Sequence, residues 1–166
     1  KKLNHEVRFL LAGDGYERDQ LLHQAEKCGI LNQTLFFIDY LPKDQMPVLL
    51  SAATVATSFF IDLPEMENNS ANKFFDALAA GKPIMINYGG WQADLLRETK
   101  AGLVVPADDP TTAAEQLNTL ISDQAALKKM GAASKRLAFQ FDVETCFKLF
   151  AKSIDTAYDI HQSNTS

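Results

Sequence analysis

Five short apolar segments, each ending in a turn and most followed by a helix-forming segment, constrain the fold of this chain more than any other feature. The first, residues 7–12, is almost wholly apolar and ends at Gly13-Asp14-Gly15, as a strand buried on both faces would. Further strands are predicted over 35–38, 55–58, 84–87 and 103–105, with helices over 17–28, 44–51, 71–80 and 91–98. This alternation predicts an α/β fold: a Rossmann-like, doubly wound parallel sheet with right-handed crossovers and helices on both faces.

The last third of the chain has a different pattern and predicts three successive helices. Asp109 and Pro110 supply an N-cap and a first-turn proline for a helix ending near Ser122. Asp123 and Asp142 can cap two more, over 124–138 and 143–160. In the last helix, apolar side chains recur at helical spacing, which predicts core packing, with a docking face for another domain as the alternative; they are Phe147, Phe150, Ile154 and Ala157. We therefore expect one domain over 1–160 and a disordered polar tail over 161–166.

Composition and charge narrow the classes of protein to which this chain can belong. Of its 166 residues, 46% are hydrophobic and 22% are charged, as in an ordinary globular domain, and no apolar run reaches the roughly 20 residues that span a bilayer. The net charge of -5 argues against nucleic acid as a partner. The two cysteines, Cys28 and Cys146, are far apart, which argues against a zinc site or a disulfide framework and favours the cytoplasm. Without an initial Met or a secretory signal, the sequence is expected to be part of a longer protein.

The loops after the strands are the expected ligand site, because an open parallel sheet binds ligands outside the carboxyl ends of its strands. The first loop, with Gly13 and Gly15, allows a tight turn before a helix start, where an anion is favoured. Arg18 stands where the dinucleotide fingerprint requires a third glycine, so NAD binding is disfavoured. A plain strand-to-helix turn remains the alternative for this loop.

The segment 65–83 carries the strongest candidate site. A polar loop leads into a helix with Asn69 or Ser70 as the cap, free backbone amides, and Lys73 as a cation, which together suit a diphosphate. Asn72 and Lys73 lie four and three residues before Asp76, so all three share a helix face, and a carboxylate there can accept from both hydroxyls of a ribose. The alternative is a solvated ion pair between Lys73 and Asp76. Trp91, after Gly89-Gly90, either caps the crevice or belongs to the core.

Four stretches of this sequence resemble a known family. They read AGDGYERDQL, LFFIDYLPKDQMPVLLSAATVATS, NKFFDALAAGKPIMINYGGWQADLL and GLVVPADDP. In order and spacing they resemble the carboxyl-terminal, donor-binding half of a family 4 (group 1) GT-B glycosyltransferase. The segment NNSANKFFDALAAGKPI is most similar to bacterial O-antigen or capsule sugar transferases of the L-fucosamine transferase type.

The resemblance implies a reaction and a place in the cell. It implies retaining, metal-independent transfer from a nucleotide diphosphate sugar, with a UDP-sugar favoured and no cofactor; consistently, the sequence has no D-x-D motif. It also implies that a missing amino-terminal half binds a lipid-linked or polysaccharide acceptor in surface glycan synthesis. The full-length enzyme would work in the cytoplasm. Peripheral association with the inner face of the membrane is compatible with this role.

The resemblance also assigns roles to individual residues. The family motif has two glutamates separated by seven residues; Asp76 falls on the second, which binds ribose, and Asn68 falls on the first, with Glu67 as the shifted alternative. Asn68, Lys73 and Asp76 are thus the expected catalytic residues. The remaining donor-binding residues implied are Gly13, Gly15, Ile38, Tyr40, Leu41, Asn69, Ser70, Ala71 and Asn72. The rival interpretation is a stand-alone flavodoxin-like nucleotide-binding or regulatory module without transfer activity.

Overall fold

The computed structural model describes residues 7–165, and its strands are all parallel. β1 (Phe9–Ala12) pairs with β2 (Leu35–Ile38), with Phe9 opposite Leu35. A second sheet has the order β3-β4-β5 and consists of β3 (Ala56–Ser58), β4 (Ile84–Ile86) and β5 (Gly102–Val104). The Rossmann-like α/β class is confirmed. Among the described residues, however, the five strands form two sheets and not the single sheet that the alternation predicts, because apolar runs locate strands without specifying which edges pair.

The helices follow the strands as predicted, with small shifts at their ends. They are α1 (Arg18–Lys27), α2 (Met46–Ala52), α3 (Asn72–Ala79), α4 (Gly90–Thr99), α5 (Pro110–Ser122), α6 (Gln124–Ala138) and α7 (Val143–Thr165). Short 3₁₀ turns, η1 (Lys43–Gln45), η2 (Pro64–Asn68) and η3 (Phe139–Phe141), precede α2, α3 and α7. The predicted bounds of α5 and α6 are confirmed at both ends, because capping residues define them.

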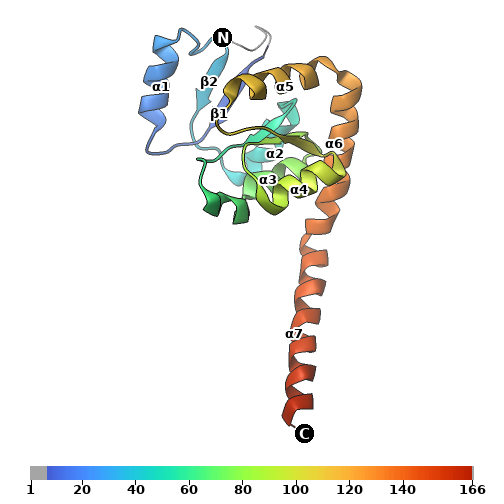
Figure 1. Ribbon diagram of the computed structural model, residues 1–166. Coiled ribbons are helices and arrows are strands. Elements are labelled where there is room, and N and C mark those ends of the chain that lie inside the picture. The colour runs from blue at the N-terminus through green and yellow to red at the C-terminus, as the bar shows by residue number, and fades with distance from the viewer. Residues whose placement is uncertain (1–6, 166) are drawn as a thin grey trace.

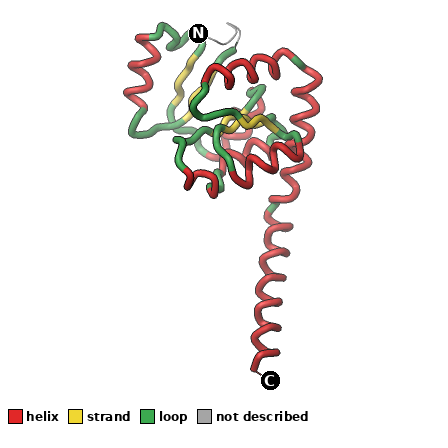
Figure 2. The backbone as a smooth tube through the Cα atoms, viewed as in Figure 1, coloured by secondary structure: helices red, strands yellow, loops and turns green. Residues whose placement is uncertain are grey.

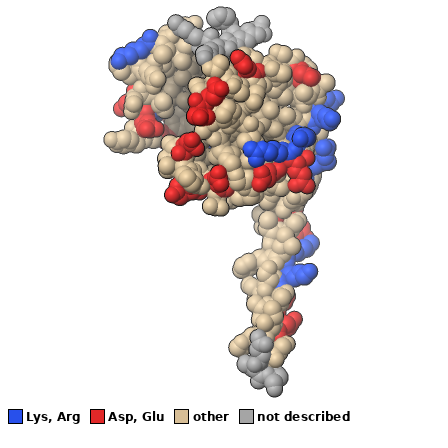
Figure 3. Space-filling model, in the orientation of Figure 1, with Lys and Arg blue, Asp and Glu red and all other residues tan. Residues whose placement is uncertain are grey.

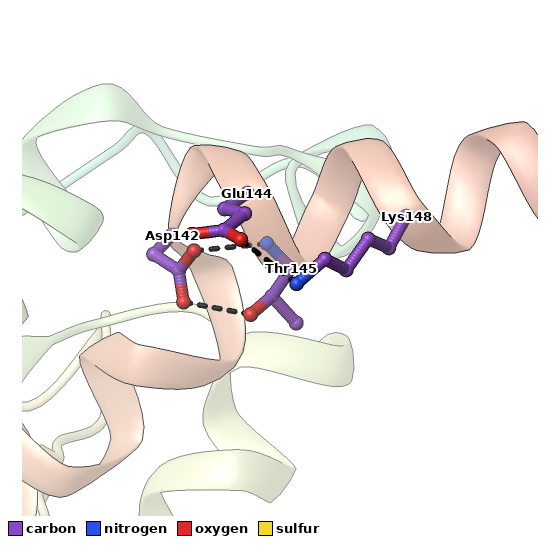
Figure 4. Close-up of polar contacts among 4 residues, drawn as sticks. All are labelled: Asp142, Glu144, Thr145 and Lys148. Carbon is purple, nitrogen blue, oxygen red and sulfur yellow. Dashed lines mark hydrogen bonds and ion pairs between the residues drawn. The ribbon is translucent and has the colours of Figure 1, made fainter.

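Aspartate caps fix the three C-terminal helices. The Asp109 carboxylate accepts from the backbone N–H of Thr111 and of Thr112, each at 3.0 Å, and the Asp123 carboxylate accepts from Ala126 N–H at 2.9 Å. Figure 4 shows the third cap, where Asp142 accepts from the Thr145 backbone N–H at 2.9 Å and from its hydroxyl at 2.7 Å. These two bonds hold the pKa of Asp142 below its usual range.

The main core lies between the three-stranded sheet and the helices α3, α4 and α6. β4, the central strand, is buried along its whole length. The side chains that are almost fully buried in this core are Phe74, Leu78, Ile84, Ile86, Leu96 and Leu137. Apolar burial on this scale is what holds α3, and hence the candidate site residues on it, in a fixed place.

Helix α7 does not pack as the sequence predicts. It projects away from the body as a single rod (Figures 1 and 2), and Phe147, Phe150 and Ile154 are 67%, 64% and 54% exposed. The expectation that these side chains are core is therefore wrong for the described residues; helical spacing groups apolar side chains on one face but does not supply a partner for that face. In Figure 3 the charged side chains of α7 lie along one side of the rod.

The C-terminal residues differ from expectation as well. The predicted tail over 161–166 is helical as far as Thr165, which the absence of Gly and Pro after Asp142 allows. Within residues 7–165, no helix combines the length and the apolar character needed to cross a membrane.

Candidate functional site

The first two strand-end loops form one half of the predicted crevice. Gly13 has a φ of 134°, a conformation that L side chains rarely adopt, and its N–H donates to the carbonyl oxygen of Ile38 at 3.1 Å. The loop after β1 is thereby joined to the loop after β2. Gly15 lies two residues further on, where its N–H donates to the Asp14 carboxylate at 2.8 Å.

An ion pair that the sequence analysis missed spans these loops. Arg18 Nη2 lies 2.9 Å from Asp39 Oδ1, next to Tyr40, whose side chain is 75% exposed. Ile38 and Leu41 are half-buried in the same segment. The residues expected to face the base therefore lie on the β1–β2 sheet, whereas the residues expected to hold the phosphates and ribose lie on α3, against the other sheet. No local pattern indicates a contact between residues 21 positions apart.

The start of α3 leaves backbone donors available. Its N-cap is Ala71, in extended conformation, and no side chain makes a cap hydrogen bond. The expectation that Asn69 or Ser70 caps this helix is therefore wrong. The helix begins at Asn72, one residue later than predicted, so the cap position falls on Ala71, whose side chain has no acceptor. The carbonyl oxygen of Asn69 accepts from Trp91 Nε1 at 3.1 Å. The Phe74 N–H donates to the Ala71 carbonyl oxygen at 3.0 Å, whereas the N–H groups of Asn72 and Lys73 have no partner among the described residues and can bind an anion.

Lys73 stands in the first turn of α3 and contacts a ring. Its Nζ lies 4.5 Å from the centroid of the Phe60 ring, and desolvation lowers the pKa of Lys73 below its ordinary value. Asp76 follows one turn later and is half-buried. The ion pairs within residues 7–165 do not include Lys73 with Asp76, so the alternative of a solvated pair between them is wrong.

The 3₁₀ turn before α3 packs against the start of α4. A Cβ on Gly90 would lie 2.0 Å from the carbonyl oxygen of Glu67, and Gly90 has a φ of 77°. A Cβ on Gly89 would lie 3.1 Å from Oε1 of the same glutamate. The backbone of Glu67 thus lies against the start of α4, and both Glu67 and its neighbour Asn68 are exposed. The sequence places Gly89-Gly90 after a predicted strand, but it does not indicate that Glu67 packs against these two glycines.

Asn87, which directly follows β4, is hydrogen-bonded to the loop after β3. Its side-chain Oδ1 accepts from the Phe60 N–H at 2.9 Å, and its Nδ2 donates to the Phe60 carbonyl oxygen at 2.8 Å. No role for Asn87 is predicted from the sequence, because it ends an apolar run and is typical of the end of a strand. The structure makes it the link between the two strand ends beside Lys73.

Trp91 is half-buried and packs against aromatic side chains beside the candidate site. Its ring lies 6.2 Å, 6.1 Å and 6.1 Å, between centroids, from the rings of Phe74, Phe75 and Phe141. Its Nε1 also donates to the carbonyl oxygen of Asn69, so both alternatives for this residue, core packing and a place at the crevice, stay predictions. Ser70 and Asn72, which flank the Ala71 cap, are exposed at the helix start.

The described part of the chain shows no group of three or more His, Cys, Asp and Glu side chains that could hold a metal ion. His5, one of three histidines whose positions in the sequence show no metal-ligand spacing, lies outside the described residues. What the site does offer is a cation, uncapped helix amides and a carboxylate within two turns of one helix, a combination that suits a phosphorylated, hydroxyl-bearing ligand.

Comparison with known proteins identifies the family. The family described as Glycosyl transferases group 1 matches residues 1–137. The chain belongs to the group 1 glycosyltransferases. Its resemblance to this family is therefore confirmed, and so is its assignment to an enzyme family.

Individual relatives of this group 1 glycosyltransferase are distant and longer. It is 29% identical over 136 residues to a glycogen synthase of Mycobacterium tuberculosis, covering 81% of this chain and 31% of that protein. It is 26% identical over 159 residues to an α-1,4-N-acetyl-D-galactosaminyltransferase of Campylobacter jejuni that acts on a diNAcBac-PP-undecaprenol-linked glycan, covering 92% of this chain and 41% of that one. The chain thus spans well under half the length of these relatives.

The fold is shared with solved GT-B structures. The crystal structure of Anabaena Alr3699/HepE in complex with UDP superposes with a TM-score of 0.81 at 21% identity, covering 93% of this chain and 42% of that chain. At this identity the likeness concerns the fold. The group 1 glycosyltransferase is therefore a Rossmann-like domain of the GT-B type.

Proposed function

We propose that this domain binds the nucleotide diphosphate sugar donor of its enzyme, with a UDP-sugar favoured. Lys73 and the free N–H groups at the start of α3 hold the diphosphate, with Ser70, Ala71 and Asn72 lining it. Asp76 accepts hydrogen bonds from the ribose hydroxyls. The observation that carries the proposal is the start of α3, which has no side-chain cap, bears Asp76 one turn later and carries a lysine that has no ionic partner within residues 7–165.

The remaining donor-binding residues are proposed on the other sheet. Gly13 and Gly15 allow close approach of the backbone to the ligand, and Ile38, Tyr40 and Leu41 face the base. UDP is present in the HepE structure that shares this fold, which supports the choice of nucleotide. Near the sugar, Asn68 takes the place of the first acid of the family motif, with Glu67 as the alternative.

The proposed chemistry is retaining, metal-independent transfer. In this step the bond from the sugar's anomeric carbon to the diphosphate breaks and negative charge develops on the departing diphosphate. The same carbon bonds to an acceptor hydroxyl oxygen, and the hydroxyl proton passes to the departing diphosphate. A lysine ammonium and oriented backbone N–H groups stabilise such charge without reorganising, which is the main electrostatic contribution that this domain can make. Positioning of the donor supplies the rest.

The role of the complete enzyme is proposed from the resemblance and from the named relatives. A separate amino-terminal half would bind a lipid-linked or polysaccharide acceptor, as in O-antigen or capsule synthesis of the L-fucosamine transferase type. The enzyme would act in the cytoplasm, with peripheral association at the membrane. The Campylobacter relative, whose name includes an undecaprenol-linked substrate, supports a lipid-linked acceptor. The 166-residue chain alone should transfer no sugar, since a site at one edge of a domain leaves the reacting carbon open to water.

The test is nucleotide binding by Asp76→Ala. This change removes the acceptor of two charge-assisted hydrogen bonds, so UDP affinity measured by calorimetry should fall at least about tenfold, or about 1.4 kcal/mol, while the melting temperature is retained. Asp94→Ala is the matched control, because Asp94 is an exposed carboxylate on α4 that pairs with Arg97 at 2.9 Å. Equal affinities of wild type and Asp76→Ala for UDP, GDP and ADP would contradict the proposed ribose contact.

A further inference from the structure

Phe60 is held in place through its backbone by a single side chain. Asn87 Oδ1 accepts from its N–H at 2.9 Å, and Asn87 Nδ2 donates to its carbonyl oxygen at 2.8 Å. A primary amide presents one acceptor and one donor side by side, as a peptide group of a neighbouring strand does. The last backbone pair between β3 and β4 joins Ser58 to Ile86, so Asn87 continues the pairing of the two strands beyond their ends.

The Phe60 ring is oriented by a buried tyrosine. The rings of Phe60 and Tyr88 meet edge to face, with centroids 5.2 Å apart and an interplanar angle of 74°. Tyr88 is 7% exposed, and its hydroxyl lies 3.3 Å from Ser58 Oγ and donates to Gln92 Oε1 at 2.8 Å. Burial raises the pKa of Tyr88, so the hydroxyl keeps the proton that it donates. The ring of Phe60 is therefore fixed in both position and tilt.

Lys73 is the cation that this ring contacts, with its Nζ 4.5 Å from the centroid. A lysine has four rotatable side-chain bonds and loses conformational entropy when its ammonium is confined. A ring already facing the ammonium confines it before any ligand arrives, and it covers only one side of a group with three N–H donors. The uncovered donors remain available to oxygen atoms.

We propose that Phe60 is a positioning residue of the donor site: its ring holds the Lys73 ammonium beside the start of α3, and Asn87 holds the ring. This inference rests on the proposed function of the site. It assigns to the loop after β3 a part in diphosphate affinity, although that loop contributes no charged group to the contact. Phosphate-free ligands such as uridine gain nothing from the arrangement.

The contact itself is tested without any nucleotide. The side-chain methylene protons of a lysine above a ring face shift upfield in NMR spectra, so those of Lys73 should lie upfield of those of Lys129, an exposed lysine on α6. Phe60→Leu keeps an apolar side chain but removes the ring and should abolish the shift, whereas Phe60→Tyr should retain it. Identical Lys73 shifts in wild type and Phe60→Leu would overturn the proposal.

The consequence for binding is tested with UDP and uridine on the 166-residue chain. Phe60→Leu should weaken UDP three- to tenfold and uridine less than twofold, and Phe60→Tyr should restore UDP affinity to within about twofold of wild type. Asn87→Asp, which keeps the acceptor but loses the donor to Phe60, should weaken UDP in the same direction. In a double-mutant cycle, Phe60→Leu should cost little UDP affinity once Lys73→Ala is present, a coupling that a general packing role would not produce.

Two negative results have different meanings. If wild type binds UDP no better than uridine, both the proposed donor site and this inference are overturned. If wild type prefers UDP, and Lys73→Ala removes that preference while Phe60→Leu folds and retains it, the donor site stands and the role of Phe60 is overturned. Additive losses from Phe60→Leu and Lys73→Ala would also overturn it.

Discussion

β4 and β1 are both short runs of apolar residues, but the structure places them in very different surroundings. β4 pairs on both edges, with β3 and β5, and all three of its residues are buried. β1 pairs with β2, and three of its four residues are exposed, among them Leu10 at 45% and Leu11 at 41%. The helix that follows β1 adds one buried residue, Ala25. Burial thus depends on how many packed elements surround a strand as well as on its composition.

The largest effect expected from this difference is on stability. Phe74→Ala, at a fully buried position on α3, should lower the free energy of unfolding by about 3–5 kcal/mol, because it leaves a cavity in the main core. Leu10→Ala on β1 should cost about 1 kcal/mol or less, since much of that side chain is already in water. Urea unfolding of the two variants measures both values. Similar losses would mean that β1 is packed in solution as tightly as the main core.

The second prediction concerns α3, which packs on the three-stranded sheet and carries the lysine proposed to bind phosphate. Lys73→Ala should weaken UDP about tenfold and uridine less than twofold, and added salt should weaken UDP binding by the wild type. Because desolvation lowers the pKa of Lys73, UDP affinity should also decline with rising pH earlier than it would with an ordinary lysine. Calorimetry with both ligands measures this, with Lys129→Ala as a control. Equal losses for UDP and uridine would place Lys73 away from the phosphates.

Helix α7 differs from both β1 and β4, because its start is stabilised by a cap more than by packing. The folded pKa of Asp142 is lowered, so its carboxylate stabilises the helix start at pH values above its unfolded pKa of about 3.9, and this contribution is lost as pH falls through the folded pKa. Asp142→Ala should therefore reduce helicity at pH 7, by a difference from wild type that shrinks below about pH 4. Circular dichroism at 222 nm measures it.

The control for this cap lies on the same helix. Asp155→Ala removes an exposed carboxylate from the middle of α7 and should leave helicity at pH 7 almost unchanged. A loss of helicity in Asp142→Ala that is equally large at pH 3 and pH 7 would show that the carboxylate charge is not what stabilises the helix start.

Local patterns predicted the elements well, and distant contacts account for what they missed. Asp109, Pro110 and Asp123 define the bounds of α5 and α6 because caps act on the nearest backbone groups. Lys73 and Asp76 were placed on one helix because their spacing of three residues is itself a pattern. The hydrogen bonds between Asn87 and Phe60 join positions that are 27 residues apart, and no pattern in the sequence near either residue indicates them. On α7, the apolar spacing identified side chains suited to burial but could not say what would cover them.

The close approach of Glu67 to Gly90 changes where substitutions should be tolerated. Tolerance usually follows exposure, yet Gly90 is only half-buried and still has no room for a Cβ, which would lie 2.0 Å from a backbone oxygen. A saturation scan across the start of α4 should therefore find its least permissive position at Gly90 and not at the fully buried Ala93. Any replacement must displace the backbone at Glu67, a few residues before the start of α3, so the cost would be felt at the donor site as well as in the fold.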